Sequence, residues 1–511
     1  MSLVTPSQIQ DAEALTALLT DAPSGGDLRF ADRQRRWLTP SSNTYTQNIC
    51  FDMGSIDKIW SLWENSILRL PLDITFSAAL TPSPVFPPVA FKDSVLSALY
   101  RFVVKSANGG SFNLDQGNNS LTWANHLRLA LAEDEDWLQA VGPELHFSRD
   151  RGHKGVPSLK NLDEIQYPNV SPYIGTPVIG GAGQDGTFLN TAYNQGFSER
   201  RGYLMKAVTS DLGVVPALNG TTLSFIARIP LRAISDAFRA LGESGPLFSE
   251  RLQFEFYLAS TVNTAYCPIA IGSVIGAGAG ANTQSSGGTV NISVTPGIEP
   301  RLYYEEVTMR PEQAALASQR LANGYQKRLL YRTYEVAKDV QVQQNVANGA
   351  VITHRVASSA VAAQRLWVLC YPTGVLNTTG WPGILCTGPN SLMNMNVMIN
   401  GKSVFNQPIN TVDEQYEMFK DAAHIGADSQ ERESMISFTD FRLTNRLVPI
   451  DLSRTFSLMA DPNAPCDLQV TGTVASVGNV DIVYVLEKLE EAVFDFSNGL
   501  VRTSVGPALV R

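Results

Sequence analysis

The sequence predicts a mainly β protein made of two tandem β-sandwiches with short helices in their loops. Only 17% of the 511 residues are charged, and 39 Gly and 28 Pro supply many turns, a balance that favours β structure. Short segments rich in β-branched and aromatic residues recur along most of the chain. Several of them occur twice in the same order, which indicates an internal duplication.

The predicted strands are separated by clusters of Gly, Pro, Asn and Ser, as in sandwiches and barrels. Long helical patterns between them are few, so a parallel sheet of strand-helix-strand units is not expected. The predicted strands are residues 44–53, 68–78, 201–210, 222–231, 250–260, 301–309, 329–337, 364–372, 467–476 and 480–489.

The first 40 residues are expected to form an arm attached to this body. Residues 7–20 fit a short amphipathic helix. The densest basic cluster of the chain follows, and its arginines are candidate contacts to a partner protein or a genome. The alternative is an ordinary solvated tether. The candidate residues are Arg29, Arg33, Arg35 and Arg36.

Residues 391–420, SLMNMNVMINGKSVFNQPINTVDEQYEMFK, change from strand to turn to helix. The Asn400-Gly401 pair permits the positive φ angles of a tight hairpin turn. Thr411 and Glu414 have the spacing of a capping box, in which the two side chains satisfy free amides at a helix start. We therefore predict one corner of a sandwich here: strand, hairpin, short strand and capped helix.

A counterpart of this corner lies at residues 94–131, with its own Asn-Gly turn and with Ser120 at the position of Thr411. Two further pairs of segments follow in both halves. IPLRAISDAF with ERLQFEFYLAS corresponds to VPIDLSRTF with DLQVTGTVAS, and RLYYEEVTM corresponds to DIVYVLEKL. These alignments place Pro230 against Pro449 and Tyr304 against Tyr484.

The duplication divides the chain into an arm, two sandwiches and a tail. The first copy is the longer one, and its extra segments, residues 172–190 and 271–288, have the Gly-rich composition of long loops. The predicted units are the N-terminal arm (1–40), the first sandwich with long loop insertions (41–312), the second sandwich (313–490) and the C-terminal tail (491–511).

Charge and cysteine content limit the possible functions. A net charge of −9 argues against a surface built as a whole to bind nucleic acid, so any such contact is local. The N-terminus lacks the features of a signal peptide, and no segment is suited to span a membrane. The cysteines lack metal-ligand spacing and are expected to be reduced, mostly buried thiols: Cys50, Cys267, Cys370, Cys386 and Cys466.

No catalytic, metal-binding or cofactor-binding residues emerge, and the sequence does not predict an enzyme. Residues 274–282, VIGAGAGAN, fit a dinucleotide-binding glycine pattern, but the residues that follow do not favour the helix that such a site requires. The acidic run at residues 133–136 lacks the ligand spacing of a calcium loop. The histidines show no zinc-ligand spacing. A pair of carboxylates contributed by different strands, as in glycoside hydrolases, stays open.

The order of PLDITFSA, the NVMINGKSVF hairpin before EQYEMF, and IPL before a strand resembles a viral family. It resembles the double jelly-roll major capsid proteins of virophages, polinton-like viruses and related double-stranded DNA viruses, over roughly residues 40 to 490. The resemblance implies two tandem jelly rolls per chain. It also implies homotrimers whose six lobes form a pseudo-hexameric capsomer that tiles an icosahedral capsid.

The resemblance further implies a location in the virion capsid, with synthesis and assembly inside the host cell. The implied partners are other copies of the chain, penton or other minor capsid proteins and, through the arm, the genome or an internal membrane. Removal of residues 1–37 is then expected to preserve trimers but impair particle assembly. The alternatives are a carbohydrate-binding or carbohydrate-active β-sandwich protein and a viral tail or fibre component.

Overall fold

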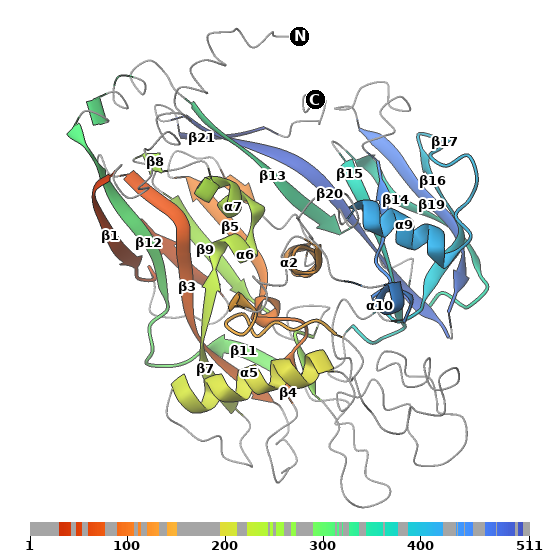
Figure 1. Cartoon of the computed structure of the whole chain (residues 1–511), viewed down its shortest axis with the longest axis horizontal. Coiled ribbons are helices and arrows are strands. Elements are labelled where there is room, and N and C mark those ends of the chain that lie inside the picture. Colours follow the sequence, from red (N-terminus) through yellow and green to blue (C-terminus); the bar gives the residue numbers. More distant parts are fainter. Residues whose placement is uncertain are drawn as a thin grey trace, which may run out of the picture.

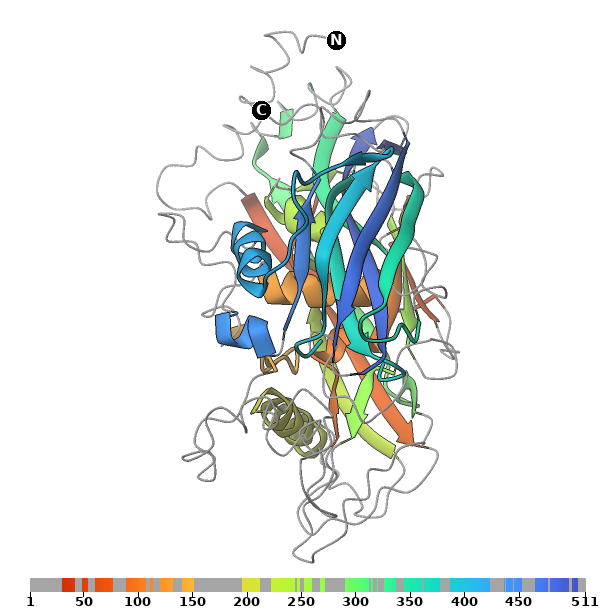
Figure 2. The ribbon, with the colours of Figure 1, turned by 90° about the vertical axis from the view of Figure 1, so that its right-hand side faces the viewer.

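A computed structural model of the chain shows two β-sandwich lobes side by side along the longest axis (Figures 1 and 2). It describes residues 30–41, 48–53, 60–76, 89–106, 111–113, 120–131, 140–150, 195–211, 222–243, 246–248, 252–259, 267–271, 290–311, 314–315, 319, 326–336, 344–360, 363–376, 387–422, 436, 438–443, 445–452, 465–476, 478–495 and 499–503. The predicted helix at residues 7–20 lies outside these ranges.

The first lobe packs two antiparallel sheets face to face. One sheet has the strand order β1-β12-β3-β7, with β8 and β11 also paired to β3, and the other has the order β2-β9-β5-β6. The strands are β1 (Phe30–Leu38), β2 (Asn48–Asp52), β3 (Trp60–Phe76), β4 (Val89–Phe91), β5 (Leu99–Ser106), β6 (Ser111–Asn113), β7 (Thr222–Pro230), β8 (Leu247–Phe248), β9 (Leu252–Leu258), β10 (Ile269–Ile271), β11 (Val290–Val294) and β12 (Arg301–Met309).

The second lobe repeats the arrangement. Its sheets have the orders β13-β20-β15-β18 and β14-β19-β16-β17, and β21 pairs with β20. The strands are β13 (Gln326–Val336), β14 (Val351–Ala360), β15 (Ala363–Pro372), β16 (Ser391–Ile399), β17 (Lys402–Ser403), β18 (Val448–Asp451), β19 (Cys466–Ala475), β20 (Val480–Asp495) and β21 (Gly499–Thr503). The helices of both lobes are η2 (Val95–Ala98), α2 (Ser120–Leu131), α5 (Gln195–Asp211), α6 (Leu231–Ile234), α7 (Asp236–Glu243), α9 (Val412–Ala422) and α10 (Phe438–Leu443).

The two strand orders are the same when β1, β2, β3, β5, β6, β7, β9 and β12 are matched in turn with β13 to β20. Each lobe is a jelly roll, so the predicted fold class is confirmed. The duplicated segments fall on matching elements. Pro230 and Pro449 lie in β7 and β18, Tyr304 and Tyr484 lie in β12 and β20, and the two predicted corners form β5-β6-α2 and β16-β17-α9.

Alternating side chains build the core of each lobe. In β9 and β19, buried and partly exposed residues alternate along the whole strand, as expected when one face of a sheet is buried. The first core is centred on the fully buried Trp63. Its ring centroid lies 5.4 Å from that of Tyr304 in the same sheet and 5.0 Å from that of Phe254 on β9 of the facing sheet. The contact between Trp63 and Phe254 joins the two sheets of the first lobe.

Two sequence predictions differ from the structure. Residues 201–210 belong to α5 and are not a strand, because the buried residues Leu204, Met205 and Val208 recur at helical spacing. Residues 30–38 lie within the predicted arm but form β1, which pairs with β12 along its whole length. The predicted boundary at residues 312 and 313 falls between β12 and β13, and the predicted tail begins within β20.

The corner at residues 391–420 forms as predicted. Asn400 and Gly401 have φ angles of 50° and 79°, and both residues of this turn therefore occupy the left-handed region. The capping box is present: the Glu414 amide donates to Thr411 Oγ1 at 3.2 Å, and the Thr411 amide donates to Glu414 Oε2 at 2.9 Å. Backbone hydrogen bonds from Asn410 and Thr411 lower the pKa of Glu414.

We expect Thr411→Ala to lower the free energy of unfolding by about 1 kcal/mol, because the Glu414 amide loses its acceptor. Urea denaturation of the wild-type and variant proteins measures the difference. Thr411→Ser is the matched control and should stay close to wild type, since serine caps helices equally well. A T411S variant as unstable as T411A would show that the methyl group, and not the cap, matters.

Candidate functional site

Helix α2 joins the two lobes. It lies between them in Figure 1 and contributes to both cores. Leu121 and Leu129 pack in the first core, whereas Trp123 packs against the second, with its ring 5.6 Å from that of Tyr371. The surface of the second lobe that α2 covers is the outer face of the β13-β20-β15 sheet. The contact that Trp123 makes between the lobes is therefore apolar and buried.

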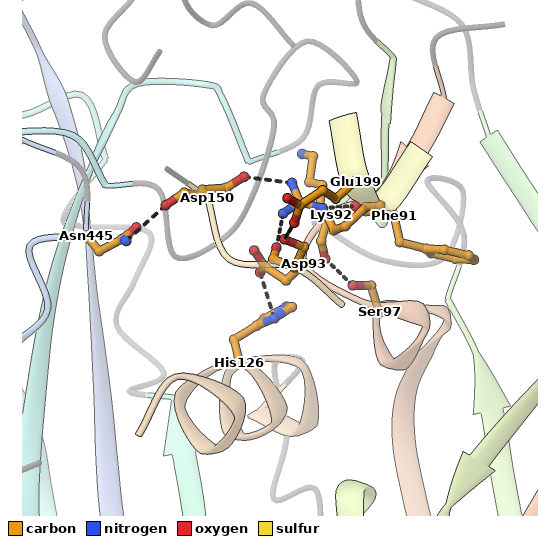
Figure 3. Close-up of polar contacts among 10 residues, drawn as sticks. Phe91, Lys92, Asp93, Ser97, His126, Asp150, Glu199 and Asn445 are labelled. Carbon is orange, nitrogen blue, oxygen red and sulfur yellow. Dashed lines mark hydrogen bonds and ion pairs between the residues drawn. The ribbon is translucent and has the colours of Figure 1, made fainter. Parts of the chain in front are cut away.

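A polar cluster lies next to α2, where loops of both lobes meet (Figure 3). Its centre is Arg200 on α5, whose side chain is fully buried together with that of Asp150. Arg200 Nη2 donates to Asp150 Oδ1 at 2.7 Å, and its remaining nitrogens donate to the carbonyl oxygens of Phe91 and Ser148. One guanidinium thus fixes three chain segments, which its planar set of donors is suited to do.

Gly196 allows α5 to approach this cluster closely. A Cβ atom at this position would lie 2.1 Å from the carbonyl oxygen of Arg149, closer than any side chain tolerates. The glycine thus brings α5 against the loop that carries Asp150.

Two hydrogen bonds of the cluster cross between the lobes. Lys92 Nζ donates to the carbonyl oxygen of Leu376 at 3.2 Å, and Asn445 Nδ2 donates to that of Asp150 at 3.4 Å. Burial lowers the pKa of Lys92 to about 8. Beside it, Asp93 Oδ2 lies 2.7 Å from His126 Nδ1 on α2. This arrangement ties loops of the two lobes together.

His146 is a buried histidine at the edge of this region. It packs against the rings of Phe91 and Phe225, and burial lowers its pKa to about 4. Below the ordinary histidine pKa of 6.5, the imidazole binds a proton in the unfolded chain but stays neutral in the folded chain. The free energy of unfolding therefore decreases as the pH is lowered from 6.5 to 4. The stabilising contribution of the neutral ring is complete above pH 6.5 and is lost progressively down to pH 4.

We expect the His146 effect to cost the wild type about 2 kcal/mol of unfolding free energy between pH 7 and pH 5. His146 has a φ angle of 50°, which asparagine tolerates, so His146→Asn is the matched variant. Urea denaturation of both proteins at the two pH values isolates the histidine. An equal acid sensitivity of wild type and H146N would contradict this assignment.

The outer face of the first lobe's β1-β12-β3-β7 sheet carries unpaired positive charge. Arg69 on β3 is directly opposite Arg228 on β7 and also opposite Arg301 on β12. The side chains of Arg69 and Arg228 make no hydrogen bond or ion pair with any residue that the structure describes. Like charges at directly opposite positions destabilise a sheet, so this arrangement needs another explanation.

A pocket of about 320 Å³ opens at these arginines. Two aromatic residues border the same face: Arg35 stacks on the ring of Tyr303, and Arg301 stacks on that of Trp37, which is 52% exposed. The face therefore combines guanidinium groups with aromatic rings, the composition typical of interaction surfaces. The residues that line the pocket are Arg35, Ile67, Arg69, Arg228 and Tyr303.

The structure separates the four arginines predicted as candidate contacts. Arg33 and Arg36 form ion pairs with Glu305 and Glu306 on the neighbouring β12, at 2.6 Å and 3.0 Å. Arg35 lines the pocket, and Arg29 lies outside the described residues. Sequence reasoning missed Arg69 and Arg228, because isolated arginines in separate strands form no cluster along the chain.

Other sequence features bear less on the site. The glycine pattern at residues 274–282 and the acidic run at residues 133–136 lie outside the described ranges. No group of potential metal ligands occurs among the residues that the structure describes. In the same part of the chain, no helix is long and apolar enough to cross a membrane. Cys50, Cys267, Cys370 and Cys466 are free thiols, and Cys386 lies outside the described ranges.

Two jelly rolls of the same strand order in one chain define a double jelly-roll protein. Comparison with solved structures agrees. The fold is similar to that of the mavirus major capsid protein, with a TM-score of 0.53, 12% identity and coverage of 95% of this chain and 94% of that one. It is also similar to a chain of the Sputnik virophage, with a TM-score of 0.51, 14% identity and coverage of 94% and 89%. No protein-family model and no curated protein matches the sequence.

Proposed function

We propose that this chain is a non-enzymatic major capsid protein of an icosahedral virus. The observation that carries the proposal is the repeated strand order, which spans nearly the whole chain and nearly the whole mavirus capsid protein. The function follows from the duplication. Three copies of a two-lobed chain present six similar lobes, so a trimer with threefold symmetry imitates a hexagonal tile.

The geometry of the lobes supports this role. The two jelly rolls stand beside one another with their strands running in similar directions (Figure 2), and α2 buries an apolar contact between them. The lobes therefore form a rigid pair rather than independent modules on a linker. A rigid pair is the unit that a regular surface lattice requires.

Purified full-length protein tests the proposal directly. We expect sedimentation to give a species of three times the chain mass of 55.6 kDa, and negative-stain images to show hexagonal blocks and closed particles. A protein that remains monomeric and forms no particles under any condition would exclude the capsid role. Binding on a glycan array or hydrolysis of a glycan, without assembly, would favour the carbohydrate-binding alternative.

We further propose that the residues before β1 contact the inside of the particle: a minor capsid protein, the genome or an internal membrane. Removal of residues 1–37, suggested by the sequence, would delete most of β1 and damage the first sheet. Removal of residues 1–28 is the sharper test, because it leaves β1 complete. We expect trimers of normal stability and a reduced particle yield. Unchanged particle yield would argue against a role for this segment.

A further inference from the structure

Within one chain, the second lobe already shows how two jelly rolls pack side by side. The part of its β13-β20-β15 outer face that surrounds Trp367 and Leu369 is apolar and buried against the first lobe. Trp367 is opposite Val485 in this sheet, and Leu369 is opposite Val483. All four side chains are buried. Helix α2 of the first lobe provides part of the covering surface through Trp123.

The matching face of the first lobe is the outer face of its β1-β12-β3-β7 sheet. We call it the arginine face, after Arg35, Arg69, Arg228 and Arg301. Ile67 is opposite both Pro230 and Tyr303, as Trp367 is opposite both Pro449 and Val485. The same register places Arg69 and Arg301 where the second lobe has Leu369 and Val483. An apolar, buried face in one lobe therefore corresponds to a basic, partly exposed face in the other.

The corresponding helices of the two lobes, α2 and α9, differ in charge. Helix α2 contains no acidic residue, and its side chains from Leu121 to Leu129 are buried. Its counterpart α9 holds one face against its own lobe through Gln415 and Phe419. The other face of α9 exposes four acidic residues, with Lys420 as the only base of the helix: Asp413, Glu414, Glu417 and Asp421.

We infer that the arginine face of one copy binds the acidic face of α9 in a second copy. The contact repeats between chains the packing that β13-β20-β15 makes with α2 within a chain. Its binding groups are Arg69, Arg228 and the flanking Arg35 and Arg301 on one side, and carboxylates of α9 on the other. Three observations support this choice of partner: the matched positions in the two lobes, the opposite charges, and a net chain charge of −9 that makes the arginine face exceptional.

The two faces cannot meet within one chain. Figure 1 shows β1 and β12 at one end of the long axis and α9 near the other. Such a contact joins unlike surfaces, so it closes into a ring only if the rotation between neighbouring copies allows closure. The inference rests on the proposed capsid function, for which a ring of three copies is the expected unit.

Charge reversal tests the contact with the full-length protein. We expect R69E/R228E to associate at least about 100-fold more weakly than wild type in sedimentation velocity over a dilution series, because like charges then face each other. The variant R69E/R228E/D413R/E417R reverses both sides and should restore the trimer. The control R310E/K206E makes the same change of net charge at exposed positions outside this face and should trimerise normally. Thermal unfolding verifies that all variants fold.

Each outcome separates this inference from the proposed function. If wild type and R69E/R228E each form trimers equally well, the inference is overturned and the capsid role stays intact. Loss of trimers without rescue by the four-residue variant would exclude α9 as the partner. Normal trimers combined with loss of binding to a fluorescent DNA oligonucleotide would assign the arginines to nucleic acid instead. A wild type that forms neither trimers nor particles overturns both.

Discussion

Replacement of Arg200 by alanine should lower the free energy of unfolding by about 3–5 kcal/mol. The variant leaves the Asp150 carboxylate fully buried without its cation, and it removes the donors to the carbonyl oxygens of Phe91 and Ser148. Three segments of the first lobe would lose their common anchor. Urea denaturation followed by tryptophan fluorescence measures the loss. Hydrogen exchange should show it first in α5 and in residues 140–150.

Arg355→Ala is the matched control for Arg200→Ala. Arg355 also binds a single aspartate, Asp467, at 2.6 Å, but its side chain is 58% exposed. Exposed pairs contribute little, so we expect a loss below about 1 kcal/mol. The variant R200M/D150N removes both charges and should recover part of the stability that R200A loses. Equal losses in R200A and R355A would refute the anchoring role of Arg200.

Trp123→Ala should lower the stability by about 3–5 kcal/mol and weaken the contact between the lobes. Trp123 is 6% exposed and reaches from the first lobe to Tyr371 of the second, so its removal leaves a cavity between the two cores. We expect thermal unfolding to separate into two transitions, one for each lobe. Differential scanning calorimetry provides the measurement, with the wild type unfolding in a more cooperative manner.

The exposed Trp37 provides the control for this substitution. Its side chain is 52% exposed on β1, so Trp37→Ala should change the stability by about 0.5 kcal/mol or less. A single cooperative transition in W123A, with a loss no larger than that of W37A, would show that α2 does not couple the lobes.

The fold was predictable where local signals and repetition agreed. The corner at residues 391–420 carries an Asn-Gly turn and a capping box, and each of these fixes backbone geometry through neighbouring residues alone. The duplication then extended the prediction to α2 and to a second sandwich in the same chain. Strands such as β9 and β19 bury one face, so their alternation is also visible in the sequence.

Other parts depend on contacts between distant residues and left no local signal. Strand β1 is an edge strand with exposed residues throughout 31–37, so it lacks alternation and its basic sequence was assigned to an arm. The buried cluster joins Arg200 to Asp150 and Lys92 to Leu376, pairs that only the tertiary structure brings together. The arginine face likewise could not be predicted, because it forms only through the register of three adjacent strands.

The difference between the two matching sheet faces has a consequence for the chain before assembly. A free chain that exposed a second face like that of Trp367 and Val485 would carry a large apolar patch and would aggregate with any similar surface. Under the proposed function, an arginine face stays hydrated, limits aggregation of the unassembled chain and discriminates against uncharged partners. Contacts through such a face weaken with salt and re-form. In the proposed capsid, an incorrectly joined subunit could therefore leave before the shell closes around the error.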